Sequence, residues 1–256
     1  MAKIRVTVWN EFRHEREKEN VREIYPNGIH ECIKDFLSAD DTLEVTTAFL
    51  DSPDNGLPDE LLNNTDVLVW WGHMAHDEVP DELAQKIHDR VVNDGMGFIA
   101  LHSAHHSKPF ISLMGTPCDL CWGANQPEIV WTIMKNHPVA EGIPEYIHLE
   151  SEELYGEPFS IPQPDELVFA SWYKFGYVFR SGCAWYRGMG KVFYFSPGHE
   201  TCRSFYNPLV QKVINNAIHW AAPINFGSKY EVGGPHRHSL VKQLGIEPRT
   251  GEDDDE

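Results

Sequence analysis

Gly97-Phe-Ile-Ala-Leu-His-Ser103 is a short apolar run that ends directly in a histidine. The same arrangement occurs twice more, in Asp66-Val-Leu-Val-Trp-Trp-Gly-His73 and in Lys191-Val-Phe-Tyr-Phe-Ser-Pro-Gly-His199. Continuous apolar runs of this length are typical of strands buried in a parallel sheet. In open α/β sheets, ligands bind in the crevice beyond the carboxyl ends of the strands. If the three strands are neighbours, the sequence predicts that their histidines meet in one site.

The segments around these runs alternate between strand and helix patterns. Residues 3–9 and 43–50 are predicted as two further strands, and residues 27–37 carry apolar side chains at helical spacing. A second helix begins at Pro80 and ends at Asn93-Asp-Gly95. The resulting order, βαβαβαβ, predicts an α/β fold with a doubly wound, mostly parallel sheet and helices on both faces.

The pattern changes to strands at hairpin spacing between about residues 116 and 186, which predicts a β-rich insertion. Its expected strands are residues 126–134, 145–150, 166–173 and 177–186. A helix then begins at Asn207-Pro208 and ends at Pro223. We therefore expect a single domain over residues 1–222 and an irregular tail over residues 223–256. The acidic end of the tail is expected to be disordered, and the tail offers a route to a homo-oligomer.

Charge and composition exclude several classes of function. The 256 residues carry a formal net charge of −18, whereas a nucleic-acid partner needs clustered lysine and arginine. Binding to an anionic membrane surface is disfavoured for the same reason, and no apolar run approaches the roughly 20 residues of a membrane span. The N-terminus lacks the apolar segment of a signal peptide, and the five scattered cysteines do not form a disulfide framework. We expect a cytoplasmic protein.

The histidines at the strand ends predict a metal site. Imidazole suits both proton transfer near neutral pH and the binding of zinc-like metals. A catalytic zinc site has about three protein ligands and leaves one position open. We expect a divalent transition metal, zinc in the first place, with ligands drawn from His73, His102, His105 and His199. No compact motif such as H-E-x-x-H is present, and the alternative is that some of these histidines are hydrogen-bonded structural groups.

The same turn allows a second chemistry that needs no metal. Ser103 lies at a strand-to-helix turn, the place of the nucleophile in many α/β enzymes. A nucleophile there needs a base within hydrogen-bond reach. His199 would be that base, and Glu200 would orient it. The motif around Ser103 is incomplete, and the absence of cysteine at the turn excludes thiol chemistry there.

Residues 150–157, Glu-Ser-Glu-Glu-Leu-Tyr-Gly-Glu, concentrate carboxylates around a phenol. Such a run is either a solvated edge or the source of an acid/base carboxylate, Glu153 or Glu157, with Tyr155 binding a substrate oxygen. Trp71 and Trp122 lie near the expected site in sequence. Their rings would suit stacking on a sugar, although packing in the core is the alternative.

Seven motifs, in order along the chain, resemble those of the trehalose-utilisation (ThuA-like) family. They are Trp70-Trp-Gly-His-Met-Ala-His76, Leu101-His-Ser-Ala-His105, Met114-Gly-Thr116, Asn136-His-Pro138, Glu153-Leu-Tyr-Gly-Glu157, Arg180-Ser-Gly-Cys183 and Phe195-Ser-Pro-Gly-His-Glu200. The resemblance covers roughly residues 3–222. It implies the flavodoxin-like fold of the class I glutamine amidotransferases, and it ranks His105 above His106 as a site residue.

The resemblance also bears on function. Glutamine amidotransferases carry cysteine at the elbow, where this chain has His102-Ser103, so we expect glutamine hydrolysis to be lost. The family implies catabolism of trehalose, a related disaccharide or a keto-sugar. We therefore predict a metal-assisted enzyme that isomerises, eliminates from or hydrolyses such a carbohydrate, with His102, Glu153 and His199 as catalytic groups. Two alternatives stay open: a metal-free hydrolase using Ser103, and a non-catalytic sugar-binding or regulatory protein.

Overall fold

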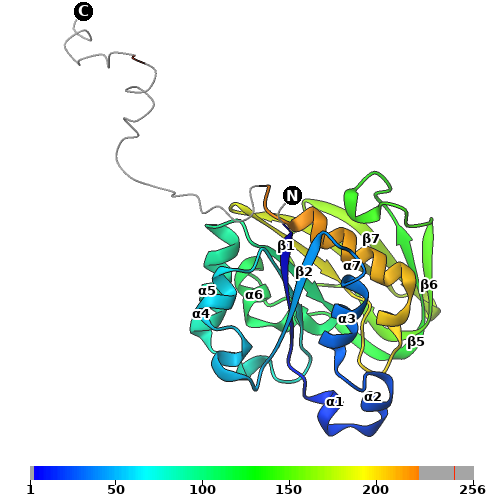
Figure 1. The fold of residues 1–256 in the computed structure, drawn as a ribbon. Coiled ribbons are helices and arrows are strands. Elements are labelled where there is room, and N and C mark those ends of the chain that lie inside the picture. The colour runs from blue at the N-terminus through cyan, green and yellow to red at the C-terminus, as the bar shows by residue number, and fades with distance from the viewer. Residues whose placement is uncertain (1–2, 225–244, 246–256) are drawn as a thin grey trace, which may run out of the picture.

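The computed structural model describes residues 3–224 and residue 245. Within them, one nine-stranded sheet has the order β2-β1-β3-β4-β9-β8-β7-β5-β6 (Figure 1). The strands are β1 Ile4–Asn10, β2 Leu43–Phe49, β3 Val67–Trp71, β4 Gly97–Leu101, β5 Cys121–Thr132, β6 Tyr146–Gly156, β7 Glu166–Tyr173, β8 Val178–Arg187 and β9 Gly190–Phe195. The helices are α1 His14–Glu17, α2 Glu19–Ile24, α3 Ile29–Leu37, α4 Asp59–Asn63, α5 Asp81–Val92, α6 Lys108–Met114 and α7 Pro208–Ala221.

Five neighbouring strands, β2-β1-β3-β4-β9, are parallel throughout. Their order is that of flavodoxin-like sheets, which confirms the predicted fold class. Strands β3 and β4 are buried along their whole length, because helices cover both faces of the sheet. Helices α3 and α7 pack in one core cluster, and α5 and α6 pack in the other.

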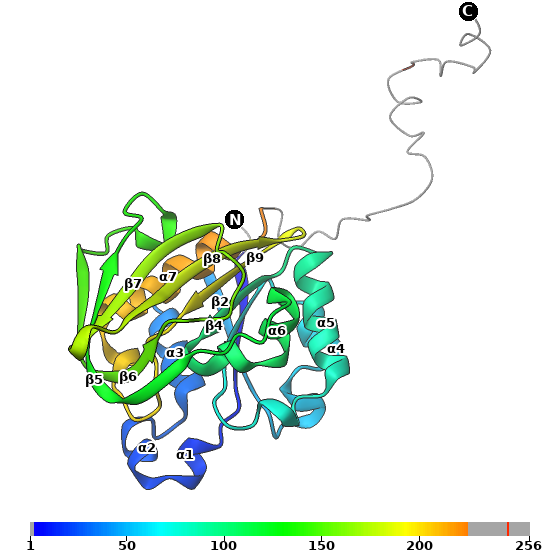
Figure 2. The same ribbon diagram turned by 180° about the vertical axis from the view of Figure 1, so that it is seen from behind.

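The other half of the sheet consists of strands β8, β7, β5 and β6, paired antiparallel. This half corresponds to the insertion predicted around residues 116–186. It extends the sheet away from α4 and α5 (Figure 2). The sheet as a whole is therefore mixed, with its parallel pairing confined to the flavodoxin-like half.

The structure differs from the expected elements in a few places. Strand β6 continues to Gly156, so most of the carboxylate run at 150–157 lies on a strand that enters the molecule rather than on a loose edge. Helices α1, α2 and α4 were not predicted, because four to six residues are too few to show helical periodicity.

Helix α7 ends at Ala221, one residue before the predicted end of the domain. Almost all of the predicted tail, residues 223–256, lies outside the described residues. Within the part of the chain that the structure describes, no helix has the length and apolar character needed to cross a membrane.

Candidate functional site

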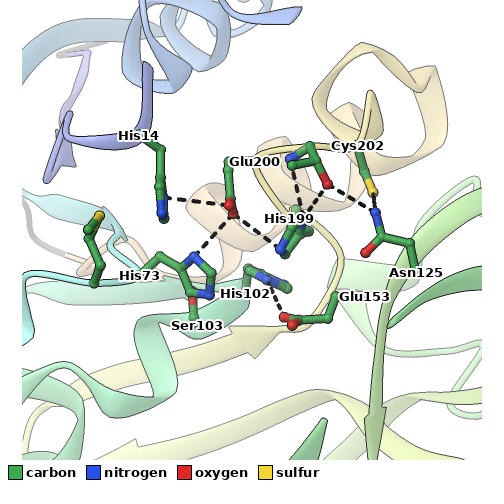
Figure 3. Close-up of polar contacts among 12 residues, drawn as sticks. His14, His73, His102, Ser103, Asn125, Glu153, His199, Glu200 and Cys202 are labelled. Atoms are coloured by element: carbon green, nitrogen blue, oxygen red, sulfur yellow. Dashed lines mark hydrogen bonds and ion pairs between the residues drawn. The ribbon is translucent and has the colours of Figure 1, made fainter. Parts of the chain in front are cut away.

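Three histidines meet where strands β3, β4 and β9 end. Because these strands are adjacent and parallel, His73, His102 and His199 leave them at the same edge of the sheet (Figure 3). The ring centroids lie 5.9 Å apart for His73 and His102, 5.4 Å for His73 and His199, and 5.3 Å for His102 and His199. The predicted convergence of imidazoles is therefore present in the fold.

His102 occupies a strained backbone position directly after β4. Its φ is 53°, in the left-handed region that side chains other than glycine rarely adopt. The ring is fully buried, and its Nδ1 lies 2.8 Å from the carbonyl oxygen of Ser196. A carbonyl only accepts hydrogen bonds, so Nδ1 carries a hydrogen and Nε2 is left to face another partner.

The insertion places a carboxylate beside Nε2 of His102. Glu153, on β6, places Oε2 3.2 Å from His102 Nε2, and the hydroxyl of Tyr155 lies 3.2 Å from the same nitrogen. Four residues can each offer one ligand atom to a common ion: His73, His102, Glu153 and His199. These four atoms lie within 4.8 Å of one another. Three imidazoles and one carboxylate thus surround one small volume.

Polar neighbours fix the other two rings. His73 Nδ1 lies 3.1 Å from Glu200 Oε2, and His199 Nδ1 lies 2.7 Å from the hydroxyl of Thr201. The Glu200 side chain is 2% exposed and also lies 3.3 Å from His199 Nε2. His199 Nδ1 also accepts the Thr201 backbone N–H at 3.2 Å, so contacts at the Nδ1 side help to position both rings.

Two other buried carboxylates hold the loops that carry these histidines. Glu11 accepts hydrogen bonds from the backbone N–H groups of residues 73–75, at 2.7 to 3.1 Å. Glu152 accepts them from Gly198 and His199, each at 2.9 Å, and also accepts from the hydroxyl of Ser204. Because several N–H groups donate to each buried carboxyl group, these contacts fix the backbone of each loop.

Burial and neighbouring groups shift the pKa values of the site residues in different directions. Burial and the neighbouring His102 lower the pKa of His199 to about 4, so its ring is neutral near pH 7. Burial alone would raise the pKa of Glu153, but the hydrogen bond to His102 holds it below its usual value. Burial opposes charge on His102 too, yet Glu153 raises the pKa of His102. Burial holds the pKa of Tyr155 well above its ordinary value, so the phenol stays protonated.

A cavity of about 240 Å³ opens beside this group. Its lining includes His73, Glu153 and Tyr155, and Trp122 also lines it with 69% of its surface exposed. The remaining lining residues are Ser103, His105, His106 and Leu120. The position of Trp122 agrees with its predicted place beside the pocket.

The carboxylate of Glu153 forms part of the cavity wall next to His73 and Tyr155. The acid/base candidate and the histidine group therefore face the same space. Since ligand pockets for larger organic molecules occupy about 300–1,000 Å³, a cavity of about 240 Å³ suits a small ligand or one ring of a larger one.

Two of the predicted site residues have other roles in the structure. His105 was expected among the metal ligands, but its Nδ1 donates to the carbonyl of Cys118 at 2.8 Å and its ring does not belong to the four-residue group. Glu153 is the fourth member of that group. Ser103 reaches the cavity, yet its hydroxyl donates to the carbonyl of Gly72 at 2.9 Å. Among the described residues, no hydrogen bond joins Ser103 to His199.

Two predicted substrate-binding residues also lie elsewhere. Trp71 is fully buried, and its indole N–H donates to the carbonyl of Gly198 at 2.9 Å, so it packs beneath the site rather than lining it. Glu157 accepts hydrogen bonds from the Arg180 guanidinium at 2.7 and 2.9 Å and does not line the cavity. It ties the end of β6 to β8.

His14 is a neighbour of the site that the sequence analysis did not identify. Its Nδ1 lies 3.7 Å from Glu200 Oε1, and His14, His73 and Glu200 form a second close group. His14 follows β1, whose carboxyl end lies at the same edge of the sheet as those of β3 and β4. The expectation that residues beyond the ends of parallel strands come together could therefore have identified His14 as well.

Comparison with known proteins points to one family. The model of the ThuA family, described as trehalose utilisation, matches residues 5–221. The comparison with curated proteins yields no match.

Several solved structures share the fold. A ThuA-like protein from Parabacteroides merdae has a TM-score of 0.64 at 14% identity, with 91% of this chain and 95% of that chain covered. A ThuA-like protein from Bacteroides uniformis has a TM-score of 0.56 at 18% identity, with coverages of 86% and 91%. A protein from Salmonella typhimurium described as cytoplasmic has a TM-score of 0.58 at 11% identity, with coverages of 85% and 99%.

Proposed function

Since the chain belongs to the ThuA family of trehalose utilisation, we propose that it is a cytoplasmic, metal-assisted enzyme acting on a keto-sugar or a related disaccharide. The observation that carries the proposal is the group of three imidazoles and one carboxylate beside a small cavity. All five cysteines are free thiols, which fits a reducing compartment such as the cytoplasm.

The donor set fits a divalent metal. His73, His102 and His199 would supply three imidazole nitrogen ligands, the number found in many catalytic zinc sites. Their Nδ1 atoms lie against Glu200, the Ser196 carbonyl and Thr201, so Nε2 of each ring would face the ion. A metal held there, zinc in the first place, supplies Lewis acidity toward a sugar oxygen or a water molecule.

The protein's own groups carry the proton transfers. Glu153 faces the cavity and is ionised at neutral pH, so it can accept a proton from a carbon next to a keto group or from a water. The Tyr155 phenol keeps its proton and can donate a hydrogen bond to a substrate oxygen. Proton abstraction next to a carbonyl, as in isomerisation or elimination, and hydrolysis both use these two groups.

Metal analysis tests the proposal directly. Purified protein, equilibrated with zinc and dialysed, is compared with His102→Ala, His199→Ala and a control, His219→Ala, on α7. We expect about one ion per chain in the wild type and the control, and loss of the ion in the two site variants. Wild-type protein that takes up no transition metal on titration would remove the metal from the proposal.

Turnover distinguishes an enzyme from a binding protein. The metal-loaded protein is incubated with trehalose, related disaccharides and their keto derivatives, and loss of substrate is followed by chromatography. We expect consumption of at least one keto-sugar, abolished in His102→Ala. Binding without consumption by the metal-loaded protein would instead identify a sugar-binding or regulatory protein.

A further inference from the structure

One face of the antiparallel half of the sheet is apolar although it faces solvent. Cross-strand pairs place Tyr146 beside Trp131, Ile129 beside Trp172, and Trp172 beside Val178. The exposed fractions are 41% for Trp131, 46% for Tyr146, 45% for Trp172 and 56% for Val178. We call this the aromatic face; it consists of Ile129, Trp131, Tyr146, His148, Ala170, Trp172 and Val178, with Phe175 on the adjoining turn.

The opposite side of the same strands is the covered one. Val130, Ile147 and Val168 alternate with the aromatic face along β5, β6 and β7, and they belong to the core cluster that contains α7. Figure 2 shows these strands at the end of the sheet opposite α4 and α5. An antiparallel sheet with one packed face normally presents polar side chains on the other, so the aromatic side chains need another explanation.

The exposed aromatic area is large enough to form the apolar part of a protein–protein interface. Phe175 is 77% exposed, and together with Trp131, Tyr146 and Trp172 it leaves on the order of 400 Å² of aromatic surface in solvent. A patch of this size is among the largest that a monomeric protein exposes, and such patches are often functional. A stable interface buries about 800 Å² per partner, somewhat more than half of it apolar. The aromatic face therefore supplies the apolar part of one such interface.

The distribution of charge favours a second copy of the chain over a basic partner at this face. With a net charge of −18, two copies repel each other over most of their surfaces. The aromatic face is poor in carboxylates: on β6 only Glu150, beyond His148, shares its side of the strand. It is thus where two acidic molecules can approach with least repulsion, whereas a basic partner would be drawn to acidic surfaces instead.

The edge of the sheet supports the same occupant. Strand β6 is the last strand of the sheet and, in the described part of the chain, pairs only with β5. A long open edge next to an apolar face invites pairing with another chain unless it is covered. Face-to-face packing about a two-fold axis would bury the aromatic face of both copies and bring each β6 edge close to the partner, because each copy presents the same face.

We propose that two copies of the chain pack face to face through the aromatic face. This inference goes beyond the proposed function and does not depend on it. The test is the mass of the full-length protein, measured by sedimentation over a wide concentration series. We expect a dimer in the wild type, strengthened by added salt because salt screens the repulsion between acidic copies.

Matched variants locate the interface. The double variant Trp131→Glu, Trp172→Glu is expected to be monomeric with an unchanged far-ultraviolet circular dichroism spectrum. Met189→Glu, at a similarly exposed apolar position (48%) on the β8–β9 turn, is expected to remain dimeric. If the double variant does not fold, Phe175→Asp tests the same face from a turn with φ of 76°, where aspartate is tolerated; dimer dissociation should rise about tenfold or more.

Two results would overturn the proposal. One is a wild-type protein that stays monomeric at every concentration and salt level. The other is a dimer that Phe175→Asp and the double variant leave intact, since the copies would then meet elsewhere. Metal binding by a monomeric variant keeps this question separate from the proposed function.

Discussion

Glu152 holds His199 in place through the backbone, its Oε1 accepting the His199 N–H at 2.9 Å. The next residue along β6, Glu153, contacts His102 on the other side of the site. Two consecutive carboxylates of the insertion thus serve two histidines that follow different strands of the parallel half. Strand β6 is therefore part of the site, and its register sets both contacts.

The role of Glu152 predicts a loss of metal affinity in Glu152→Gln. The amide replaces one acceptor oxygen by a donor, so the N–H of either Gly198 or His199 loses its partner. Outer-shell changes of this kind lower metal affinity about 10- to 100-fold. Competition with a chelator measures the effect, and Glu150→Gln, exposed on the same strand, is the control. Equal affinities for both variants would contradict the positioning role.

Glu153→Gln should separate chemistry from metal binding. Glutamine keeps the size of the side chain but cannot accept a proton, so turnover should fall about 10²- to 10⁴-fold. The three imidazoles remain, so the metal content should stay at the wild-type level. Turnover close to that of the wild type, with metal present, would show that another group carries the proton.

The position of His105 predicts that it is dispensable for the metal. Its ring is tied to the Cys118 carbonyl, so His105→Ala should retain the bound ion while His73→Ala loses it. Metal content per chain, measured side by side, decides the matter. An ion lost from His105→Ala, in protein with an unchanged circular dichroism spectrum, would restore His105 to the ligand set.

The convergence of His73, His102 and His199 was predictable because it follows from one rule. Neighbouring parallel strands end at the same edge of a sheet, so residues just beyond their ends must come together. Glu153 and Tyr155 were recognised by composition alone, as carboxylates around a phenol. Their arrival at the site depends on the register of β6 against β5, which has irregularities near Gln126 and could not be predicted.

The errors also have physical causes. His102 has a left-handed backbone, so the spacing from His102 to His105 does not give the relative direction of the two rings. Trp71 points into the core because β3 is buried on both faces. The Glu11 and Glu152 side chains accept hydrogen bonds from backbone groups far away in sequence. Such contacts produce no spacing pattern that a sequence analysis could detect.

Glu128, on β5, is a fully buried carboxyl near the site. Its Oε1 accepts a hydrogen bond from the Ser171 hydroxyl, and its Oε2 has no hydrogen-bond partner among the described residues. Burial, reinforced by the negative charge of Glu152, raises the pKa of Glu128 to about 8. The carboxyl is therefore protonated in the folded protein at neutral pH and ionised in the unfolded chain.

This difference predicts how stability changes with pH. Between the ordinary value of 4.5 and about 8, the folded state binds a proton that the unfolded state has lost. The stabilisation is therefore complete below the lower value and is lost as pH rises through the higher one. The slope is about 1.4 kcal/mol per pH unit. Glu128→Gln, which is neutral at every pH, should remove this loss, so urea unfolding should find the variant more stable relative to wild type at pH 8 than at pH 5. A constant difference between the two proteins across this range would mean that Glu128 is already ionised in the fold.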